Sequence, residues 1–246
     1  MSSNPVSSAK TISPTTVGDD VALSVHNLSK IYDSAAGKVV ALNRINFSIK
    51  QGEFVSIVGP SGSGKSTLLN LIGALDRPTR GNVFIGGADV FEQDDSKIAY
   101  MRNSLIGFIF QSYNLVNRMT VQKNVELPAI ISGMDSSKRK NLTLKILDML
   151  GIANKANHKP SNLSGGQQQR VAIARSLINN PTLILADEPT GNLDTETGHE
   201  IFELLKMLSH KFRKTVIMVT HNPELEMFSD RSIRIVDGRL ASDTTQ

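Results

Sequence analysis

Short apolar runs, separated by longer stretches with helical spacing, extend through most of the chain. The runs at 54–58, 182–186 and 215–220 are rich in Val, Ile and Leu, which predicts buried strands. A shorter apolar run at 108–110 predicts another strand, which ends at Gln111. Strands that alternate with helical segments are typical of an α/β fold.

Alternating apolar and polar residues mark a second kind of strand. This alternation occurs at 21–25 and 41–49 and, with the run at 82–85, predicts a small antiparallel sheet near the N-terminus. Near the C-terminus two short apolar runs flank the pair at 237–238, Asp-Gly, which is typical of a hairpin turn.

Helical spacing is clearest between residues 91 and 151. Apolar residues recur there at i, i+4 and i+7, as in Leu142, Ile146 and Met149, and Gly151 stands where a helix C-cap is expected. This stretch predicts a helical insertion. A later helix, after the turn at 191–194, is expected to bury Ile201, Leu204, Leu205, Leu208 and Phe212.

Composition limits the class of protein. The 246 residues are enough for one large domain, here predicted at 21–243, after a Ser-, Thr- and Pro-rich tail at 1–20 that is expected to be disordered. Cysteine is absent, which excludes disulfides and cysteine-based metal sites, and no apolar run has the length of a membrane span. The net charge is only +4 and the basic residues are scattered, so no nucleic-acid partner is expected.

The stretch at 59–67 carries the strongest chemical signal. It follows the predicted strand at 54–58 and precedes an apolar helical segment at 68–72, the context that a phosphate-binding loop requires. Its glycines permit backbone angles and close approaches that a side chain would prevent. Successive N–H groups and the positive end of the helix then face an anion. We therefore predict a nucleotide phosphate site.

Each residue of this loop belongs to the predicted site. Lys65 is expected to reach the β- and γ-phosphates, Ser66 to ligate Mg²⁺ through its hydroxyl, and Thr67 to donate to the α-phosphate. The predicted loop residues are Gly59, Pro60, Ser61, Gly62, Ser63, Gly64, Lys65, Ser66 and Thr67.

Acidic residues follow the buried strand at 182–186. In a protein with a phosphate-binding loop, such a strand delivers a carboxylate to Mg²⁺ at its end. Asp187 is the expected metal ligand, directly or through water, and Glu188 is placed to polarise the attacking water. His221 follows the strand at 215–220 on the same side, which favours a contact with the γ-phosphate over a purely structural role.

Two further residues have alternative interpretations. Tyr32, in the expected loop between the first two strands, is either a surface aromatic or a platform on which adenine stacks. Gln111 is either a plain loop residue or one that orients Mg²⁺ or the attacking water.

A second candidate anion site lies at 163–170. Ser164 is placed to cap the helix that follows, and Gly165 and Gly166 leave backbone N–H groups open near its positive end. A plain N-cap would explain the same residues. Because one phosphate loop is enough for the chain's own nucleotide, a second anion site needs a second explanation.

Taken in this order, the motifs resemble those of the ATP-binding-cassette (ABC) nucleotide-binding subunits. The Leu-Ser-Gly-Gly-Gln stretch at 163–167 is the specific part, and the resemblance covers nearly everything after Asp20. It implies a P-loop NTPase with a RecA-like core, an N-terminal antiparallel β subdomain, and a helical subdomain at about 111–166 that carries the signature. The implied cofactors are ATP and Mg²⁺.

The resemblance also implies roles for individual residues. In this family two subunits pack head to tail, and the signature residues Ser164, Gly165, Gly166 and Gln167 face the ATP held by the other subunit. Tyr32 then stacks on adenine, Gln111 links the metal site to the transport partner, and Asp194 lies at the dimer seam. The implied catalytic residues are Lys65, Gln111, Glu188 and His221, and the implied metal ligands are Ser66, Gln111 and Asp187.

The implied protein is the ATPase subunit of a membrane transporter. It would form a homodimer with ATP and act from the cytoplasmic face of the cell membrane, through a separate permease. Stretches such as those at 72–79, 124–128 and 191–194 are similar to the branch that serves lipoprotein release, macrolide export and cell division. The alternatives are a mechanotransmission ATPase, a soluble ABC protein of DNA repair or ribosome work, and a P-loop small-molecule kinase.

Overall fold

The strands form two sheets in the computed structural model, which describes residues 20–34, 37–221 and 226–245. A six-stranded sheet has the order β10-β9-β3-β8-β7-β6, and a four-stranded antiparallel sheet has the order β2-β1-β4-β5. The first contains β3 (Phe54–Val58), β6 (Ile106–Phe110), β7 (Leu183–Asp187), β8 (Thr215–Val219), β9 (Arg231–Val236) and β10 (Arg239–Thr245). The second contains β1 (Val21–Ser34), β2 (Gly37–Lys50), β4 (Arg80–Ile85) and β5 (Ala88–Asp89).

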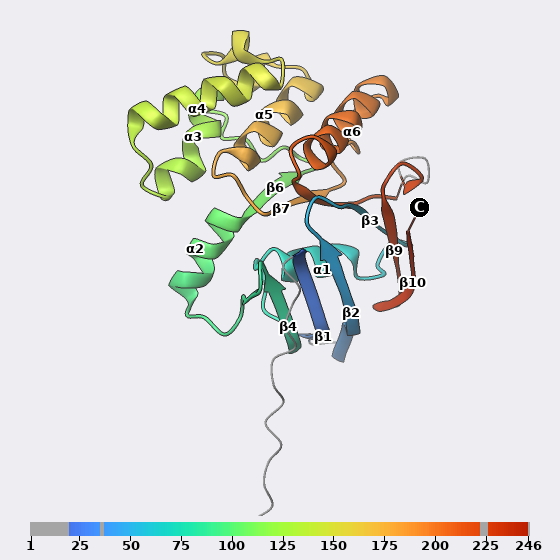
Figure 1. The fold of residues 1–246 in the computed structure, drawn as a ribbon. Coiled ribbons are helices and arrows are strands. Elements are labelled where there is room, and N and C mark those ends of the chain that lie inside the picture. The colour runs from blue at the N-terminus through green and yellow to red at the C-terminus, as the bar shows by residue number, and fades with distance from the viewer. Residues whose placement is uncertain (1–19, 35–36, 222–225, 246) are drawn as a thin grey trace, which may run out of the picture.

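Helices occupy both sides of the larger sheet. They are α1 (Lys65–Ile72), α2 (Asp95–Leu105), α3 (Val121–Ile131), α4 (Ser136–Met149), α5 (Gly165–Leu177) and α6 (Thr195–His210). Short 3₁₀ turns at Ala153–Lys155 and Pro160–Asn162 lead from α4 to α5. In Figure 1 the helices α3, α4 and α5 gather at one end of the molecule, and the antiparallel strands β1, β2 and β4 lie at the other. No helix among the described residues combines the length and the apolar character needed to cross a membrane.

The central strands β3, β7 and β8 of the larger sheet are apolar at nearly every position and are buried on both faces, whereas β10 at the edge is largely exposed. Leu183 and Leu185 of β7 belong to a core shared with α1 and the small sheet. Ile184 and Ala186 belong to a second core shared with helices α3 to α6. Successive side chains of a strand point to opposite faces, so one strand serves two cores. This arrangement confirms the predicted α/β fold with its antiparallel β subdomain.

Two local predictions are wrong. Tyr32 lies within strand β1, opposite Val39, and not in a loop. The β1–β2 ladder contains register shifts, which interrupt the alternation that marks a strand in the sequence, although the pairing itself continues. Phe212 is 48% exposed because α6 ends at His210, and Phe202 is the fully buried phenylalanine of this helix.

The predicted tail at 1–20 lies, apart from Asp20, outside the described residues. The predicted limits of the domain, 21–243, and of the helical subdomain, about 111–166, stay predictions. The structure does show Gly151 in the left-handed region, with a φ of 68°, directly after the C-cap of α4.

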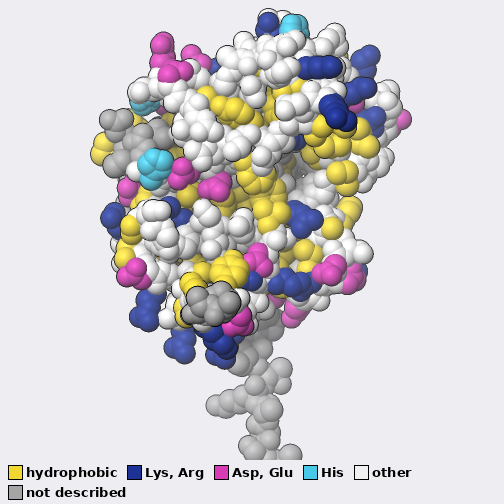
Figure 2. All heavy atoms as spheres, turned by 180° about the vertical axis from the view of Figure 1, so that it is seen from behind, with side chains coloured by type: hydrophobic (Ala, Val, Ile, Leu, Met, Phe, Trp, Pro, Cys, Tyr) yellow, Lys and Arg dark blue, Asp and Glu magenta, His cyan; other side chains and the backbone are white. Residues whose placement is uncertain are grey.

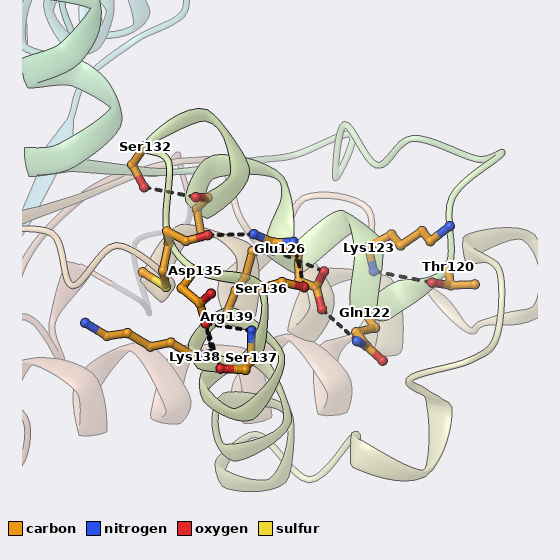
Figure 3. A network of polar contacts seen from close by, with 12 residues as sticks. Thr120, Gln122, Lys123, Glu126, Ser132, Asp135, Ser136, Ser137, Lys138 and Arg139 are labelled. Atoms are coloured by element: carbon orange, nitrogen blue, oxygen red, sulfur yellow. Dashed lines mark hydrogen bonds and ion pairs between the residues drawn. The ribbon is translucent and has the colours of Figure 1, made fainter.

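A polar network connects α3 to α4 (Figure 3). Glu126 is only 8% exposed, and its carboxylate accepts a hydrogen bond from Gln122 Nε2 at 2.6 Å and contacts Arg139 Nε at 3.4 Å. Arg139 also donates to the carbonyl of Met134, and Asp135 caps the N-terminus of α4. The buried carboxylate has partners from both helices, so the network is a structural tie between them.

Candidate active site

Four parallel strands bring the predicted catalytic residues to one edge of the larger sheet. Strands β3, β8, β7 and β6 are neighbours and run in the same direction. The loop at 59–67 follows β3, and His221 follows β8. Asp187 and Glu188 come at the end of β7, and Gln111 comes directly after β6. Because parallel strands have their carboxyl ends on the same side, these segments share one edge.

The loop at 59–67 wraps around the N-terminus of α1. Gly64 is the N-cap residue with a φ of 103°, and no side chain bonds to the helix end. Lys65 is 8% exposed, and its Nζ donates to the carbonyl oxygens of Gly59 at 2.9 Å and Pro60 at 2.8 Å. The ammonium group therefore lies over the loop, at the positive end of the helix.

Glycine is required at two positions because the backbone passes very close to other strands. A Cβ atom on Gly59 would lie 2.0 Å from the carbonyl oxygen of Ile235, at the end of β9. A Cβ atom on Gly64 would lie 2.5 Å from the carbonyl oxygen of Ala41 in β2. The phosphate-binding loop is therefore held between the two sheets.

Two adjacent carboxylates face the loop. Burial and the neighbouring carboxylate of Glu188 raise the pKa of Asp187, and the nearby charge of Lys65 partly lowers it. Glu188 has a φ of 45°, and its Oε1 lies 3.1 Å from Nδ1 of His221. The surroundings of the two carboxylates differ. Asp187 is partly buried near Lys65, whereas Glu188 contacts His221, whose side chain is 69% exposed.

A cavity of about 430 Å³ opens between these groups. It is lined by Val39, Val40, Ala41, Ser61, Gly62, Gly64, Lys65, Ser66, Thr67, Glu188 and His221. The cavity thus unites most of the loop with two of the predicted catalytic residues. Gly59, Pro60 and Ser63 do not line it, although the first two bind the Lys65 ammonium.

The donor set beside this cavity fits Mg²⁺. The hydroxyl of Ser66 and the carboxylate of Asp187 are hard oxygen ligands, which this ion prefers. Within the described part of the chain no group of three or more His, Cys, Asp or Glu side chains is able to hold a metal by itself. Mg²⁺ is commonly held by one or two protein oxygens together with nucleotide phosphates, and this site offers that arrangement.

Tyr32 belongs to a polar cluster next to the loop. Its hydroxyl donates to Asp76 Oδ2 at 2.9 Å, and Lys30 binds Asp76 Oδ1 at 2.7 Å while lying 4.8 Å from the centre of the tyrosine ring. Burial, followed by the bond to Asp76, raises the pKa of Tyr32, and a bond with Thr67 acts in the opposite direction. The ring is 39% exposed and is not part of the cavity lining.

Gln111 stands at the predicted edge, but its side chain lies against a turn. Its Nε2 donates to Asn192 Oδ1 at 3.4 Å, and the Nδ2 of Asn192 donates to the Gln111 carbonyl at 3.0 Å. A Cβ atom on Gly191 would lie 2.6 Å from the same amide nitrogen. The structure does not place Gln111 among the cavity residues, so its predicted part in metal binding stays a prediction.

The signature residues lie at the N-terminus of α5. Ser164 accepts a hydrogen bond from the N–H of Gln167, and its own N–H donates to Gln167 Oε1, which forms a capping box. Gly166 is packed so closely on α6 that a Cβ atom would lie 2.4 Å from Thr197 Cγ2. None of these residues lines the cavity at the phosphate-binding loop.

Asp194 begins the neighbouring helix α6. Its carboxylate accepts a hydrogen bond from the N–H of Thr197 at 2.9 Å, and this bond is the main reason why the pKa of Asp194 is lowered. Because Thr197 also contacts Gly166, Asp194 and the signature are adjacent.

Sequence reasoning missed three cavity residues, Val39, Val40 and Ala41, which lie in the first half of β2. Val39 and Val40 are 56% and 53% exposed. In the sequence the three residues form a short apolar run that is typical of a strand, so no local pattern marks them as part of a site.

Comparisons with known proteins identify the family. The family model described as ABC transporter matches residues 42–191. An uncharacterized ABC transporter ATP-binding protein of Thermotoga maritima is 53% identical over 211 residues, which cover 86% of this chain and 90% of that protein. The lipoprotein-releasing system ATP-binding protein LolD of Geobacter metallireducens is 46% identical over 221 residues, which cover 90% of this chain and 98% of that protein.

Two further matches extend the comparison. The macrolide export ATP-binding/permease protein MacB of Vibrio parahaemolyticus is 47% identical, over 92% of this chain but only 34% of its own length. A solved dimeric structure of the cassette MJ0796, in a post-hydrolysis state bound to ADP and Pi, has a TM-score of 0.83 and 46% identity, and covers 91% of this chain and 98% of that one. The predicted similarity to the lipoprotein-release and macrolide-export branch is confirmed. The chain belongs to the ABC transporter family, as an ATP-binding and ATP-hydrolysing component.

Proposed function

We propose that the cavity at the phosphate-binding loop binds ATP and that Glu188 polarises the water that attacks its γ-phosphate. The observation that carries this proposal is the cavity itself, which unites Lys65, Ser66, Glu188 and His221 in about 430 Å³. Lys65 neutralises the β- and γ-phosphates, and the loop amides and the end of α1 bind the rest of the triphosphate. When bound, Mg²⁺ supplies charge neutralisation beside Ser66 and Asp187.

His221 and Glu188 act together in this proposal. The 3.1 Å contact between Nδ1 and Oε1 orients the carboxylate toward the cavity. The carboxylate accepts a proton from the attacking water, and His221 donates a hydrogen bond to the γ-phosphate. A positioned general base contributes about 10²–10⁴-fold to a rate.

We further propose that two copies of the chain bind ATP head to tail. The signature residues, headed by Ser164, form a second helix terminus with open glycine amides, yet lie outside the chain's own cavity. A second copy that presented this end would complete the site, and Asp194 would then lie at the seam. The relative MJ0796 forms dimers, one of which is bound to ADP and Pi.

A membrane permease is the proposed partner, and a groove next to the site is its proposed docking place. A cavity of about 470 Å³ is lined by residues of α2, β6, α3 and α5, among them Phe110 and Asn114 on either side of Gln111. Its lining includes Arg102 and Arg175 but no acidic residue. The groove therefore suits a permease segment that carries apolar and acidic side chains, and the chain would act from the cytoplasmic face of the membrane.

The variant Glu188→Gln tests the catalytic and dimer proposals together. It keeps the size of the side chain and removes the charge that accepts a proton. We expect ATP hydrolysis to fall by about 10²–10⁴-fold while ATP binding is retained.

The same variant tests the dimer. By mass action, ATP that is no longer hydrolysed stabilises the dimer that binds it. Size-exclusion chromatography with light scattering should show a monomer without nucleotide or with ADP, and a dimer with ATP. Hydrolysis at the wild-type rate would refute the role of Glu188.

The docking groove requires a separate test. Asn114→Asp adds a negative charge to the groove, and Asn141→Asp makes the same change at an exposed position of α4. We expect Asn114→Asp to reduce recovery of a membrane protein from detergent extract with the tagged chain, while the basal ATPase rate stays unchanged. Equal recovery with both variants would place the docking surface elsewhere.

A further inference from the structure

Gln169 is a buried polar residue on the signature helix that the proposed function does not use. It lies five residues after Ser164 on α5 and has no exposed surface. Its Nε2 donates to the carbonyl oxygen of Pro189 at 2.7 Å. Its Oε1 is also buried and has no hydrogen-bond partner among the described residues.

The direction of this bond fixes the orientation of the amide. A carbonyl oxygen accepts and does not donate, so the NH₂ end of Gln169 must face Pro189 and the oxygen must point the other way. A buried acceptor without a partner lowers stability. An apolar side chain of similar size, such as Met, would remove this unpaired oxygen but would leave the Pro189 carbonyl without its donor. The specific contribution of the amide is therefore its hold on the Pro189 carbonyl.

That carbonyl belongs to the turn that sets the position of Glu188. Glu188 has a φ of 45°, which is unfavourable for a residue with a side chain, and a residue before proline is restricted further. Such a conformation persists only where the surrounding structure determines it. The N–H of Glu188 donates to the carbonyl of Val219 at 3.0 Å, and the carbonyl of Glu188 accepts from Gly191 at 3.0 Å. The bond from Gln169 ties this turn to α5.

We propose that Gln169 is a positioning residue for ATP hydrolysis, which holds the turn at 188–189, and with it the carboxylate of Glu188, in register with the signature helix. The proposal rests on the proposed catalytic role of Glu188. It makes α5 carry two functions. Its N-terminus presents the signature to a second copy, and its second turn fixes the catalytic carboxylate of its own chain.

The test substitutes Gln169→Met, with Gln168→Met as the matched control. Gln168 is the adjacent residue on the same helix, and its amide donates to the carbonyl of Leu163 instead. We expect Gln169→Met to lower kcat by about 10- to 100-fold, because small displacements of a catalytic group have effects of that size. The Kd for MgATP should change by less than about 2-fold. Tm should change little, since the variant removes the unpaired oxygen of Gln169 but leaves the Pro189 carbonyl without its donor. Gln168→Met should keep kcat within about 2-fold of the wild type.

A double variant separates a positioning role from a structural one. In single-turnover measurements, Gln169→Met combined with Glu188→Gln should be no slower than Glu188→Gln alone, because the carboxylate that Gln169 positions is already gone. An undiminished kcat for Gln169→Met would overturn the proposal. An equal loss in both backgrounds, or a fall in kcat together with weaker MgATP binding and a lower Tm, would also overturn it.

Two further variants, Gln169→Glu and Glu188→Gln, test the proposal in other ways. Gln169→Glu keeps the shape of the side chain but places an acceptor against the Pro189 carbonyl, so it should show the same loss of kcat if the Met variant does not fold. The single variant Glu188→Gln reports on the proposed function independently. If it hydrolyses ATP normally, the catalytic role fails. If it is inactive while Gln169→Met is fully active, only the positioning role fails.

Discussion

Two helix N-termini, those of α1 and α5, are built from Gly- and Ser-rich segments but differ in how their ends are satisfied. The end of α1 has Gly64 as its N-cap, which offers no side chain, and among the described residues the helix has no side-chain cap. The end of α5 is closed by the reciprocal bonds of Ser164 and Gln167. The first end opens into the cavity with the catalytic groups, and the second does not.

This difference indicates which end works within one chain. An uncapped helix terminus with Lys65 above it is ready to bind an anion by itself. At α5 the capping box satisfies part of the terminus, and the adjacent Gly165 and Gly166 lie close to the neighbouring structure. The α5 end has its cap without a ligand, and in the proposed head-to-tail dimer its ligand would be the ATP held by a second copy of the chain.

The largest expected effect comes from blocking the α5 end. Ser164→Arg fills the space beside the signature glycines, and we expect ATP hydrolysis to fall at least about 100-fold, as when donors to a transition state are lost. ATP binding to the monomer should be unchanged, and the Glu188→Gln dimer should no longer form. Ser164→Ala is the graded comparison, because it removes the hydroxyl and its cap, at a cost of about 1 kcal/mol, without filling that space. Normal hydrolysis by Ser164→Arg would mean that the two ends work independently.

The next effect concerns the α1 end. Lys65→Ala removes a charged contact to the phosphates, which is worth about 1.5–3 kcal/mol, or roughly 10- to 150-fold in affinity. Isothermal titration with MgATP should show this loss, whereas Ser164→Ala should bind ATP like the wild type. An unchanged affinity of Lys65→Ala would show that the α1 end does not hold the triphosphate as proposed.

Much of this comparison follows from the sequence because it depends on order along parallel strands. The positions of Lys65, Asp187 and His221 at one edge follow once three apolar runs are identified as neighbouring strands of one sheet. The fold class and the capping role of Ser164 follow in the same way from local patterns. These features could be predicted because they depend on the order of segments along the chain and on hydrogen bonds between residues close in sequence.

Side-chain direction and long-range contacts could not be predicted in this way. The sequence places Gln111 at the edge, but its amide turns toward Asn192, a contact between residues 81 positions apart. The strand around Tyr32 continues through register shifts that break its alternation. The bond between Gln169 and Pro189 joins α5 to the turn after β7, and no local sequence pattern predicts it.

A smaller effect should appear in stability at the α1 side. Burial raises the pKa of Asp187 above that of an unfolded aspartate, so the charged form destabilises the folded protein above the unfolded pKa. Asp187→Asn should therefore raise the Tm of the nucleotide-free protein at neutral pH. A change of about 1 kcal/mol corresponds to roughly 2–4 °C. The gain should vanish at a pH below both pKa values, where Asp187 is protonated in the folded and in the unfolded state.

The same variant tests metal binding. In the wild type, Mg²⁺ should increase the rise in Tm that ATP causes, and in Asp187→Asn this increase should be lost. An increase that is retained would show that Asp187 does not bind the ion.

The smallest expected effects belong to Tyr32, which lies beside the α1 site but outside its cavity. Stacking of a base on an aromatic ring is worth roughly 1–3 kcal/mol, and for a ring that is 39% exposed we expect the lower end, about 5-fold in the KM for ATP for Tyr32→Ala. Tyr32→Phe keeps the ring and loses only the hydroxyl, with its bonds to Asp76 and Thr67, so its KM should change by less than about 2-fold. Neither variant should alter kcat, because the ring does not reach the cavity that holds Glu188.

The comparison of ATP with inorganic triphosphate decides the role of the ring. Tyr32→Ala should weaken the binding of ATP and leave the binding of triphosphate unchanged. An equal loss for both ligands would mean that Tyr32 supports the phosphate-binding loop, through its bond with Thr67, and not the base.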